Sequence, residues 1–500
     1  MGFSRSGCTV DLATSVSRVF QSYDIRGVYP AHLTPELAFR VGRALAAYLR
    51  DNERLRSRRV VVGRDLRHGS EELAAAVAHG LLAGGVTPVD AGLISADMVY
   101  FATGEYPQDF DGGVMITASH NPPEYNGLKF VVAGAASIDA NTGLNRIRDM
   151  VIADGGGAPA ALPPLELERR ELAEAYLAKL FAIAPGPFPR GRIVVDAGNG
   201  MAAQVFPRIA ERLPCEVVPL HFALDPTFPD RGPNPSVPHS LDKLRAAVRA
   251  ERALLGIAFD ADADRVAMVD EAGQLVAGSL LTGLLAQVML CRPSAGERRP
   301  EPPEEGRCGG AKVLFDLTSG LAVEDCVREA GGTPVIAPVG HSRIKERLRL
   351  DGGLFAGEES GHYYFRDFYC CDSGMLAALV ALEALAAAGK PLSALADPLR
   401  NRYHRAPNEN YELPSRDAAV QCARLIDEMF PDAAARRVTR YGPDVRKDYD
   451  GWWFSVRPSG TEPRVLRLTA EARDRAAAEA RMAELRRPVL AAGGKPLQPH

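Results

Sequence analysis

The chain repeats one pattern three times: a short run of β-branched residues, a corner rich in Gly or Asp, and a helix rich in Ala and Leu. The runs are RRVVVGRD (58–65), RIVVDAGNG (192–200) and AKVLFDLTSG (311–320). A strand-like run that passes into a helical period is typical of α/β units. The sequence therefore predicts three similar α/β domains.

The C-terminal segment follows a different order. It consists of a helix, the strand-like WWFSVRPSG, the strand-like RVLRLTA and a closing helix rich in Ala and Arg. This order predicts a smaller α+β domain with an antiparallel sheet. A chain of 500 residues also exceeds what one hydrophobic core usually supports. We expect four domains around a central cleft, at residues 16–160, 161–273, 274–396 and 405–500.

Pro, Gly and charged residues accumulate where we expect the domains to separate. Residues 155–171 are interpreted as the first linker, and the second boundary falls just after 265–273. Residues 291–310 are too polar and Pro-rich to pack, so they are interpreted as a loop inside the third domain. Residues 397–414 precede the final domain.

Composition excludes several classes of protein. A hydrophobic share of 46% and a charged share of 24% are those of a soluble globular protein. A net charge of −4 without a basic tract argues against nucleic-acid binding. The eight cysteines show no metal-type spacing, which favours reduced thiols in the cytoplasm. We also expect no membrane partner, because no apolar run approaches the length of a span.

The stretch ITASHNPPEYNG (116–127) turns sharply between two expected strands. Ser119 is expected on this corner with its hydroxyl exposed, either as a nucleophile or as a turn former. Adjacent side chains on a strand or turn point apart, so we do not expect His120 to act as the base for Ser119.

Three aspartates follow an apolar strand in LLGIAFDADADRVAMVD: Asp260, Asp262 and Asp264, with Arg265 directly after them. Carboxylates this close repel one another unless a cation neutralises them, and oxygen ligands favour Mg²⁺ or Ca²⁺. An EF-hand loop fits poorly, because Arg265 stands where that loop needs glycine. One alternative is a solvated acidic turn. The other is a phosphotransferase of haloacid-dehalogenase type, which also carries a DxD motif directly after a strand.

Two further loops carry polar clusters. In LFAGEESGHYYF (354–365), Glu358, Glu359, Ser360 and His362 could bind a polyol, or form a plain hairpin turn. SVRPSGTEPRVLRL (455–468) suits a phosphate dianion, because guanidinium groups, hydroxyls and a glycine turn come together there. A surface turn with two unrelated arginines is the alternative for this loop.

In this order, the four loops resemble those of the α-D-phosphohexomutase family, in its phosphomannomutase/phosphoglucomutase branch. The resemblance covers nearly the whole chain, because it extends through FQSYDIRG (20–27), VGRDLRHGS (62–70), VDAGNG (195–200), FPDRGPNP (228–235) and PVGH (338–341).

For the reacting centre, the resemblance implies that Ser119 is the phosphorylated serine and that it holds Mg²⁺ with the three aspartates. Arg265 would contact the phosphoserine, and Lys129 would take part in proton transfer. The same resemblance places His120, Arg26 and His341 among the catalytic residues.

For the substrate, the resemblance implies that Glu358 and Ser360 bind sugar hydroxyls. The phosphate that does not react would be held by Arg457, Ser459, Gly460, Thr461 and Arg464.

The activity implied is interconversion of hexose 1-phosphates and 6-phosphates, through a phosphoserine and a hexose 1,6-bisphosphate that also activates in catalytic amounts. Mannose and glucose phosphates are the expected partners, with mannose preferred because HYYFRDFYCCDSGM (362–375) resembles dedicated phosphomannomutases. Closure of the fourth domain and a monomer or small homo-oligomer are also expected. A metal-dependent phosphatase with Asp260 as nucleophile, and a catalytically silent sugar-phosphate-binding protein, are the rival hypotheses.

One residue departs from the family pattern. Ala261 stands where the metal loop of the family usually has glycine. If this position requires positive φ, alanine costs on the order of 1 kcal/mol. The departure affects the expected geometry of the loop and leaves metal binding in place.

Overall fold

The computed structural model describes residues 12–154, 162–292, 310–460, 462 and 464–497. The chain divides into two compact units. The first runs to Tyr176 and includes Leu224–Pro229, whereas the second contains Leu177–Ala223 and the chain from Asp230 onward. Each unit is considered by itself below.

The sheet of the first unit is mixed. Its order is β1-β5-β4-β2-β3-β7, with β6 paired to β5. The pairs β4/β2, β2/β3 and β3/β7 are parallel, and β1/β5, β5/β4 and β5/β6 are antiparallel. The strands are β1 (Ile25–Val28), β2 (Arg59–Arg64), β3 (Thr87–Leu93), β4 (Gly112–Ile116), β5 (Tyr125–Val132), β6 (Ala136–Ser137) and β7 (Glu168–Arg169).

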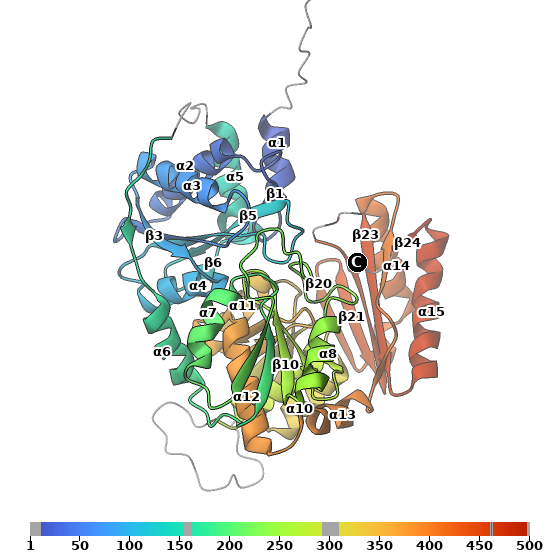
Figure 1. The fold of residues 1–500 in the computed structure, drawn as a ribbon. Helices are drawn as coiled ribbons and strands as arrows, with labels where there is room; N and C mark the ends of the chain where they lie inside the picture. The colour runs from blue at the N-terminus through green and yellow to red at the C-terminus, as the bar shows by residue number, and fades with distance from the viewer. Residues whose placement is uncertain (1–11, 155–161, 293–309, 461, 463, 498–500) are drawn as a thin grey trace, which may run out of the picture. The chain divides into compact units, whose positions relative to one another are not determined.

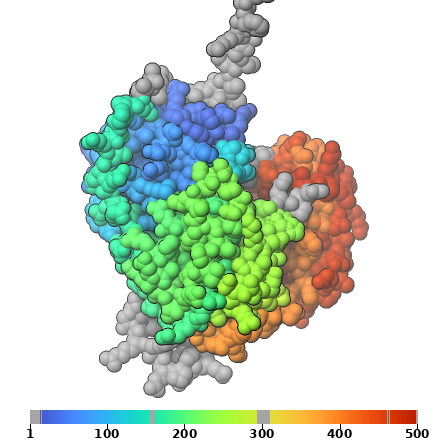
Figure 2. All heavy atoms as spheres, in the orientation of Figure 1, coloured from blue at the N-terminus to red at the C-terminus, as the bar shows by residue number. Residues whose placement is uncertain are grey.

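Helices cover this sheet (Figure 1). They are α1 (Leu12–Val19), α2 (Pro35–Asp51), α3 (Ser70–Ala83), α4 (Ala96–Glu105), the short π-helix η1 (Ala140–Leu144), α5 (Asn145–Ala153) and the start of α6 (Ala173–Ile183). Helices α2 and α3 pack closely because each places a glycine against the backbone of the other. A Cβ added at Gly42 of α2 would lie 2.3 Å from the Val77 oxygen of α3, and one added at Gly80 of α3 would lie 2.1 Å from the Phe39 oxygen of α2. In the space-filling view, the atoms of this unit are coloured from blue to blue-green (Figure 2).

The second unit contains two five-stranded sheets, of order β12-β11-β10-β8-β9 and β14-β13-β15-β16-β17. The first is built from β8 (Arg192–Asp196), β9 (Glu216–Leu220), β10 (Leu255–Phe259), β11 (Val266–Asp270) and β12 (Leu275–Val276). The second is built from β13 (Lys312–Asp316), β14 (Thr333–Ala337), β15 (Phe355–Gly357), β16 (Tyr363–Phe365) and β17 (Cys371–Asp372).

The helices that accompany these two sheets are α7 (Ala202–Ala210), α8 (Asp242–Glu251), α9 (Gly278–Leu290), α10 (Leu321–Glu329), α11 (His341–Leu350), the 3₁₀ turn η2 (Arg366–Phe368), α12 (Gly374–Ala388) and α13 (Leu392–Arg400). Helix α12 is apolar and eleven of its residues are buried, so it is a core helix of this unit. Among the described residues, no single helix is long and apolar enough to cross a membrane. Helices α12 and α13 together, which are bent relative to each other, reach the length and apolar composition of a span, and only these two criteria are met.

A fourth sheet lies near the C-terminus, and every strand pair in it is antiparallel. Its order is β20-β21-β22-β23-β19-β24, with β18 paired to β23. The elements are β18 (His404–Arg405), β19 (Glu409–Glu412), α14 (Arg416–Met429), η3 (Asp432–Ala434), β20 (Arg437–Tyr441), β21 (Asp444–Tyr449), β22 (Trp452–Pro458), β23 (Val465–Ala472), α15 (Arg475–Ala491) and β24 (Lys495–Leu497).

The first three sheets share one plan, which confirms the prediction of three similar α/β domains and an α+β domain. In each, one strand (β2, β8 or β13) has a parallel neighbour on both sides. One of these neighbours (β4, β10 or β15) then forms an antiparallel hairpin with the strand that follows it. The loops 117–124, 260–265 and 358–362 occupy the same hairpin position in the three repeats. The fold thus places the serine loop, the Asp triplet and the GEESGH loop at equivalent corners.

The segments expected to separate domains take part in the sheets. Residues 168–169 of the expected first linker pair with β3, while residues 155–161 lie outside the described structure. Residues 404–405 and 409–412 pair with β23 and extend the C-terminal sheet. Strands this short carry little periodicity, which is why the sequence did not reveal them. Of the expected loop at 291–310, residues 293–309 lie outside the described structure.

Candidate functional site

Ser119 lies in the loop between β4 and β5 with φ +50°. Its backbone N–H donates to the Thr117 hydroxyl at 2.8 Å. A non-glycine residue in the left-handed region is uncommon and often marks a functional site. Ser119 is only 1% exposed, so the expectation of an exposed hydroxyl was wrong.

The backbone of this loop is held by Arg67, which sequence reasoning missed as a site residue. Its side chain is 0% exposed, and its two terminal nitrogens donate to four carbonyl oxygens of one loop. Three of these distances are 2.6 Å to Asn121, 2.8 Å to Pro122 and 3.0 Å to Tyr125, and the fourth carbonyl is that of Ser119 itself. Arg67 therefore fixes the backbone that carries Ser119.

A second arginine, Arg26, binds the same loop from β1. It donates to the Ala118 carbonyl at 3.2 Å and to the Asn121 side chain, and its Nε lies 2.9 Å from Asp24. The sequence expected Arg26 in the site, and the structure brings it to the Ser119 loop.

The geometry of His120 differs from the expectation. The Ser119 Oγ and His120 Nδ1 atoms are 3.4 Å apart, at the outer limit of a hydrogen bond. The positive φ of Ser119 turns two adjacent side chains toward each other, so the rule that neighbours diverge does not hold at this corner.

Lys129 lies on β5 and is 5% exposed. Its neighbours Leu128 and Phe130 belong to the apolar core of the unit. Because side chains alternate along a strand, Lys129 lies on the opposite face of the sheet from these two residues.

The Asp triplet occupies the hairpin between β10 and β11. Asp260, Asp262 and Asp264 are at most 1% exposed, and each offers a carboxylate oxygen within 4.8 Å of the others. Burial of three like charges is costly unless a cation compensates them. The donor set consists of oxygen atoms, which fits a hard divalent cation.

The left-handed residue of this loop is Ala263, with φ +62°, and Ala261 is not in that region. The condition under which alanine at position 261 would strain the loop is therefore not met. Ala261 lies instead against Gly200, where an added Cβ would be 2.6 Å from the Ala261 oxygen. The close approach requires glycine at position 200.

A buried arginine also supports the strand that carries the triplet. The Nε of Arg231 donates to Asp196 at 2.9 Å, and one terminal nitrogen donates to the carbonyl of Phe259, the residue before Asp260. Its side chain is 2% exposed. Arg231 thus supports the metal loop much as Arg67 supports the serine loop, and sequence reasoning missed it too.

Arg265 begins a chain of buried polar contacts. Its backbone N–H donates to Asp260 at 3.0 Å, and its Nε donates to His362 Nε2 at 2.8 Å. The ring proton of His362 therefore lies on Nδ1, which is 2.8 Å from Asp372. Asp372 also pairs with Lys345 at 2.6 Å.

This series of buried contacts holds Asp372 ionised. Burial opposes the charge, but the Lys345 ammonium and His362 hold the pKa of Asp372 well below its usual range. His341, the first residue of α11, lies beside these contacts, with its ring centroid 6.0 Å from that of His362. The contacts fix the orientation of His362 and, through it, of Arg265.

The GEESGH loop forms the hairpin between β15 and β16, as expected. Glu358 is 3% exposed and accepts hydrogen bonds from Ser360 Oγ at 3.1 Å and from the Tyr364 hydroxyl. Burial raises the pKa of Glu358. Glu358 and Ser360 are thus brought together at a corner of the third sheet.

The neighbouring Glu359 has structural partners. It accepts from the backbone N–H of Ser279 at 3.0 Å and pairs with Arg405 at 3.1 Å. Arg405 also donates to the Thr318 carbonyl at 2.7 Å. Arg405 lies on β18 of the C-terminal sheet, so this sheet contacts the GEESGH loop.

The RPSGTEPR loop joins β22 to β23. Arg457 lies directly opposite Arg467 in the strand register, and like charges in that position repel one another. The charge of Arg467 is compensated by Glu462 of the same loop, with which it forms an ion pair at 2.5 Å. Ser459 is 9% exposed and its Oγ accepts from the backbone of Glu462 at 3.2 Å.

The other expected members of this loop differ in position. Gly460 is exposed, whereas Arg464 pairs with Glu412 on the neighbouring β19. Thr461 lies outside the described residues. A buried carboxylate, Asp444, stands near Arg457, and burial raises its pKa to about 6.

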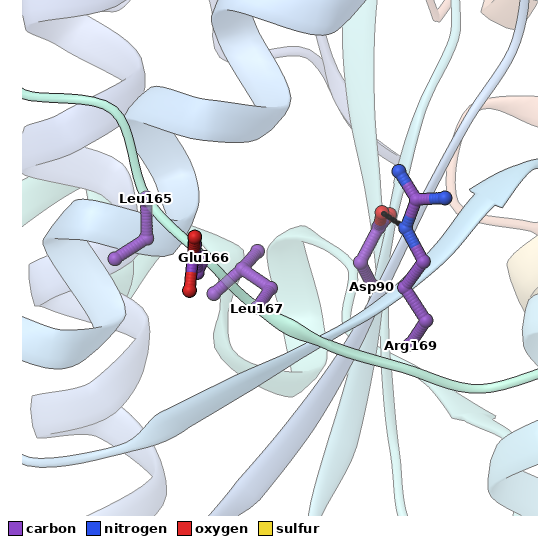
Figure 3. A pocket seen from close by; sticks show the side chains of 5 residues that line it. All are labelled: Asp90, Leu165, Glu166, Leu167 and Arg169. Carbon is purple, nitrogen blue, oxygen red and sulfur yellow. Dashed lines mark ion pairs between the residues drawn. The ribbon is translucent and has the colours of Figure 1, made fainter.

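One cavity of about 390 Å³ lies elsewhere in the first unit (Figure 3). Asp90, Leu165, Glu166, Leu167 and Arg169 line it, and Asp90 and Arg169 form an ion pair across 3.8 Å. None of the expected site residues lines this cavity.

Four family models match successive parts of the chain. They describe the phosphoglucomutase/phosphomannomutase alpha/beta/alpha domains I, II and III and the C-terminal domain, and they match residues 17–154, 174–273, 300–403 and 419–487.

Relatives extend this similarity over most of the chain. A phosphomannomutase from Salmonella montevideo is 37% identical over 464 residues, which cover 91% of this chain and 94% of that protein. A protein of Xanthomonas campestris pv. campestris named "Phosphohexose mutases" is 36% identical, over 93% of this chain and 98% of its own. The crystal structure of a phosphoglucomutase/phosphomannomutase family protein from Burkholderia thailandensis is similar with a TM-score of 0.80 at 30% identity, covering 97% of this chain and 99% of that one.

Proposed function

The chain belongs to the phosphoglucomutase/phosphomannomutase family, and from this premise we propose that it is a phosphomannomutase that also converts glucose phosphates. It interconverts hexose 1-phosphate and hexose 6-phosphate through a phosphoserine at Ser119. The observation that carries the proposal is the buried cluster of Asp260, Asp262 and Asp264, followed at once by Arg265.

Mg²⁺ is the proposed metal, and the three carboxylates would hold it together with Ser119. The oxygen donor set and its burial fit this ion. When bound, Mg²⁺ would neutralise charge on the phosphoryl group during transfer. The part of Arg265 is to contact the phosphoserine, in the orientation that His362 and Asp372 give it.

The first transfer moves the phosphoryl group from Ser119 to the free hydroxyl of the sugar. The bond between Ser119 Oγ and phosphorus breaks, a bond between phosphorus and the sugar oxygen forms, and the sugar hydroxyl loses its proton while Ser119 Oγ gains one. The product is a hexose 1,6-bisphosphate. Lys129 is the proposed proton carrier, with His120, Arg26 and His341 as the other catalytic residues.

The second transfer regenerates the enzyme. The bisphosphate turns over, its other phosphoryl group passes to Ser119 Oγ, and the proton of that hydroxyl goes to the oxygen left on the sugar. The same bisphosphate, in catalytic amounts, would phosphorylate Ser119 of enzyme that has lost its phosphate.

Substrate binding divides between two loops in this proposal. Glu358 and Ser360 bind the 3- and 4-hydroxyls, which mannose and glucose share, so the preference for mannose is modest. Arg457 and the loop 459–464 hold the phosphate that does not react, in either orientation of the sugar. The position of Arg457 near the end of β22, just before this loop, supports the anchor.

The domain limits, the location in the cell and the oligomeric state belong to the same proposal. The domain limits 16–160, 161–273, 274–396 and 405–500 are retained, with closure of the last domain during turnover. We also propose a cytoplasmic location, hexose phosphates as the partners and a monomer or small homo-oligomer, on the basis of the composition and the family.

The test combines mass spectrometry with turnover. The protein is incubated with Mg²⁺, glucose 1,6-bisphosphate and mannose 1-phosphate. We expect intact phosphate on Ser119 and formation of mannose 6-phosphate, and the Ser119→Ala variant should lose most turnover while it still binds mannose 1-phosphate.

Other outcomes favour the rival hypotheses. An acid-labile phosphate on Asp260 with release of inorganic phosphate would identify a phosphatase. No phosphorylation and no turnover would identify a binding protein. Values of kcat/KM for mannose, glucose and glucosamine 1-phosphates then rank the substrates, and a strong preference for glucosamine would contradict the assignment to mannose.

A further inference from the structure

Phe228 belongs to the short segment Leu224–Pro229, which lies in the first unit although the chain on both sides of it belongs to the second. The ring is 2% exposed, and the guanidinium carbon of Arg67 lies 5.0 Å from its centroid. Arg67 is the residue that donates to four carbonyls of the Ser119 loop.

The two kinds of contact at Arg67 are complementary. A guanidinium donates hydrogen bonds in its own plane and presents its flat face to an aromatic ring. The loop carbonyls and Asp65 contact the nitrogens of Arg67, and the guanidinium carbon lies over the ring of Phe228. Without the ring, a charged face would adjoin a void or water, and the four in-plane bonds would compete with solvent.

The backbone around Phe228 is built to present this ring. Phe228 has φ +48°, which is unfavourable for a bulky side chain. The conformation is held by Asp225, whose carbonyl accepts from the Phe228 N–H at 3.1 Å and whose carboxylate accepts from the Thr227 N–H at 2.8 Å. Strain that the surroundings maintain in this way suggests a functional constraint.

We propose that Phe228 is a positioning residue for phosphoryl transfer, because its ring holds Arg67 in the plane that fixes the Ser119 loop. The inference rests on the proposed function of Ser119. Three residues further along the chain, Arg231 supports the strand end before Asp260 within the second unit. Within four residues of sequence, Phe228 thus contacts the arginine that holds the serine loop, and Arg231 supports the strand end before the metal loop.

The test replaces the ring by an aliphatic side chain. In Phe228→Leu, the backbone amides of Ser119, Asn121 and Tyr125, which are hydrogen-bonded in the folded loop, should exchange with deuterium about tenfold faster. Phosphorylation of Ser119 by glucose 1,6-bisphosphate and kcat should fall by about the same factor, with KM for mannose 1-phosphate unchanged. Phe228→Tyr keeps the aromatic face and should restore both.

Phe110→Leu is the matched control. Phe110 is 1% exposed in the same unit and also lies under an arginine, Arg59, at 5.8 Å. Arg59 pairs with Glu168 and does not bind the serine loop. The control should lose stability without faster exchange in residues 117–125 and without slower phosphorylation.

The outcomes separate this inference from the proposed function. Wild-type exchange and phosphorylation in Phe228→Leu, or equal effects in Phe110→Leu, would overturn the role of Phe228. If wild-type protein takes up no phosphate on Ser119, the proposed function fails, and deuterium exchange in the two variants still decides whether Phe228 orders the loop.

Discussion

Asp444 offers a test of the phosphate-binding domain by pH. This residue begins β21, is 7% exposed, and has a pKa raised by burial to about 6 from an ordinary 3.8, although Arg457 and Arg343 lower it. Between these two values, the folded domain keeps the proton that the unfolded chain releases. The stabilising contribution is therefore complete below about pH 4 and is lost as pH rises through about 6.

The size of this effect follows from the two pKa values. A difference of about two pH units corresponds to about 3 kcal/mol of unfolding free energy between low pH and pH 8. Asn cannot ionise, so Asp444→Asn should be more stable than the wild type at pH 8, by up to about 3 kcal/mol, and nearly equal to it at pH 4. Removing this charge should also strengthen phosphate binding by Arg457 above pH 6, which would lower KM.

Urea unfolding followed by tryptophan fluorescence measures the difference. The two tryptophans of the chain, Trp452 and Trp453, both lie in β22, which pairs with the strand of Asp444. Asp450→Asn is the control: this residue lies in the turn between β21 and β22 with a side chain 91% exposed, so the change should have little effect at either pH. A variant at Asp444 that is equally or less stable than the wild type at pH 8 would refute the reasoning.

Three further predictions follow from the site. Asp262→Asn makes one of three buried carboxylates neutral, so the Mg²⁺ concentration for half-maximal activity should rise; an unchanged midpoint would place the metal elsewhere. Arg457→Ala should raise KM for hexose 1-phosphate and 6-phosphate alike, and an effect on one isomer alone would contradict a shared anchor. Lys345→Met leaves the buried Asp372 without its cation and should cost about 3–5 kcal/mol in urea unfolding. Adding Asp372→Asn to this variant should recover part of the lost stability. If the double variant instead loses the sum of the two single losses, the ion pair between Lys345 and Asp372 does not contribute as argued.

The sequence predicted the strand-to-helix starts and the place of the loops at strand ends, because their signals are local. The three strand-to-helix starts are confirmed by β2, β8 and β13, each followed by a helix in the expected stretch. The serine loop, Asp triplet and GEESGH loop occur at strand ends, where polar residues interrupt apolar runs. These interruptions are visible within about ten residues of sequence.

The supports of those loops were not predictable in the same way. Arg67 reaches residues 52 to 58 positions away, and Arg231 reaches Phe259, 28 positions away. The chain contains 59 lysines and arginines, and nothing local distinguishes these two. The burial of Ser119 was missed for the same reason, since it depends on contacts that only the fold creates.

The internal repeat shows where the third loop differs. Asp65 directly follows β2, whereas Asp196 and Asp316 are the last residues of β8 and β13. Each of the three aspartates accepts a hydrogen bond from the backbone N–H two residues later. In the first two repeats, an arginine that contacts this aspartate also binds a carbonyl of the functional loop or of the strand end before it.

In the third repeat, the arginines come from the C-terminal sheet. Arg405 joins the Thr318 carbonyl to Glu359 of the GEESGH loop, and Arg446 donates to the Leu317 carbonyl at 3.1 Å. The loop proposed to bind the sugar is therefore supported by the domain that carries the proposed phosphate anchor. Movement of that domain would change the support of the GEESGH loop as well as the position of Arg457, so sugar and phosphate recognition would change together during closure.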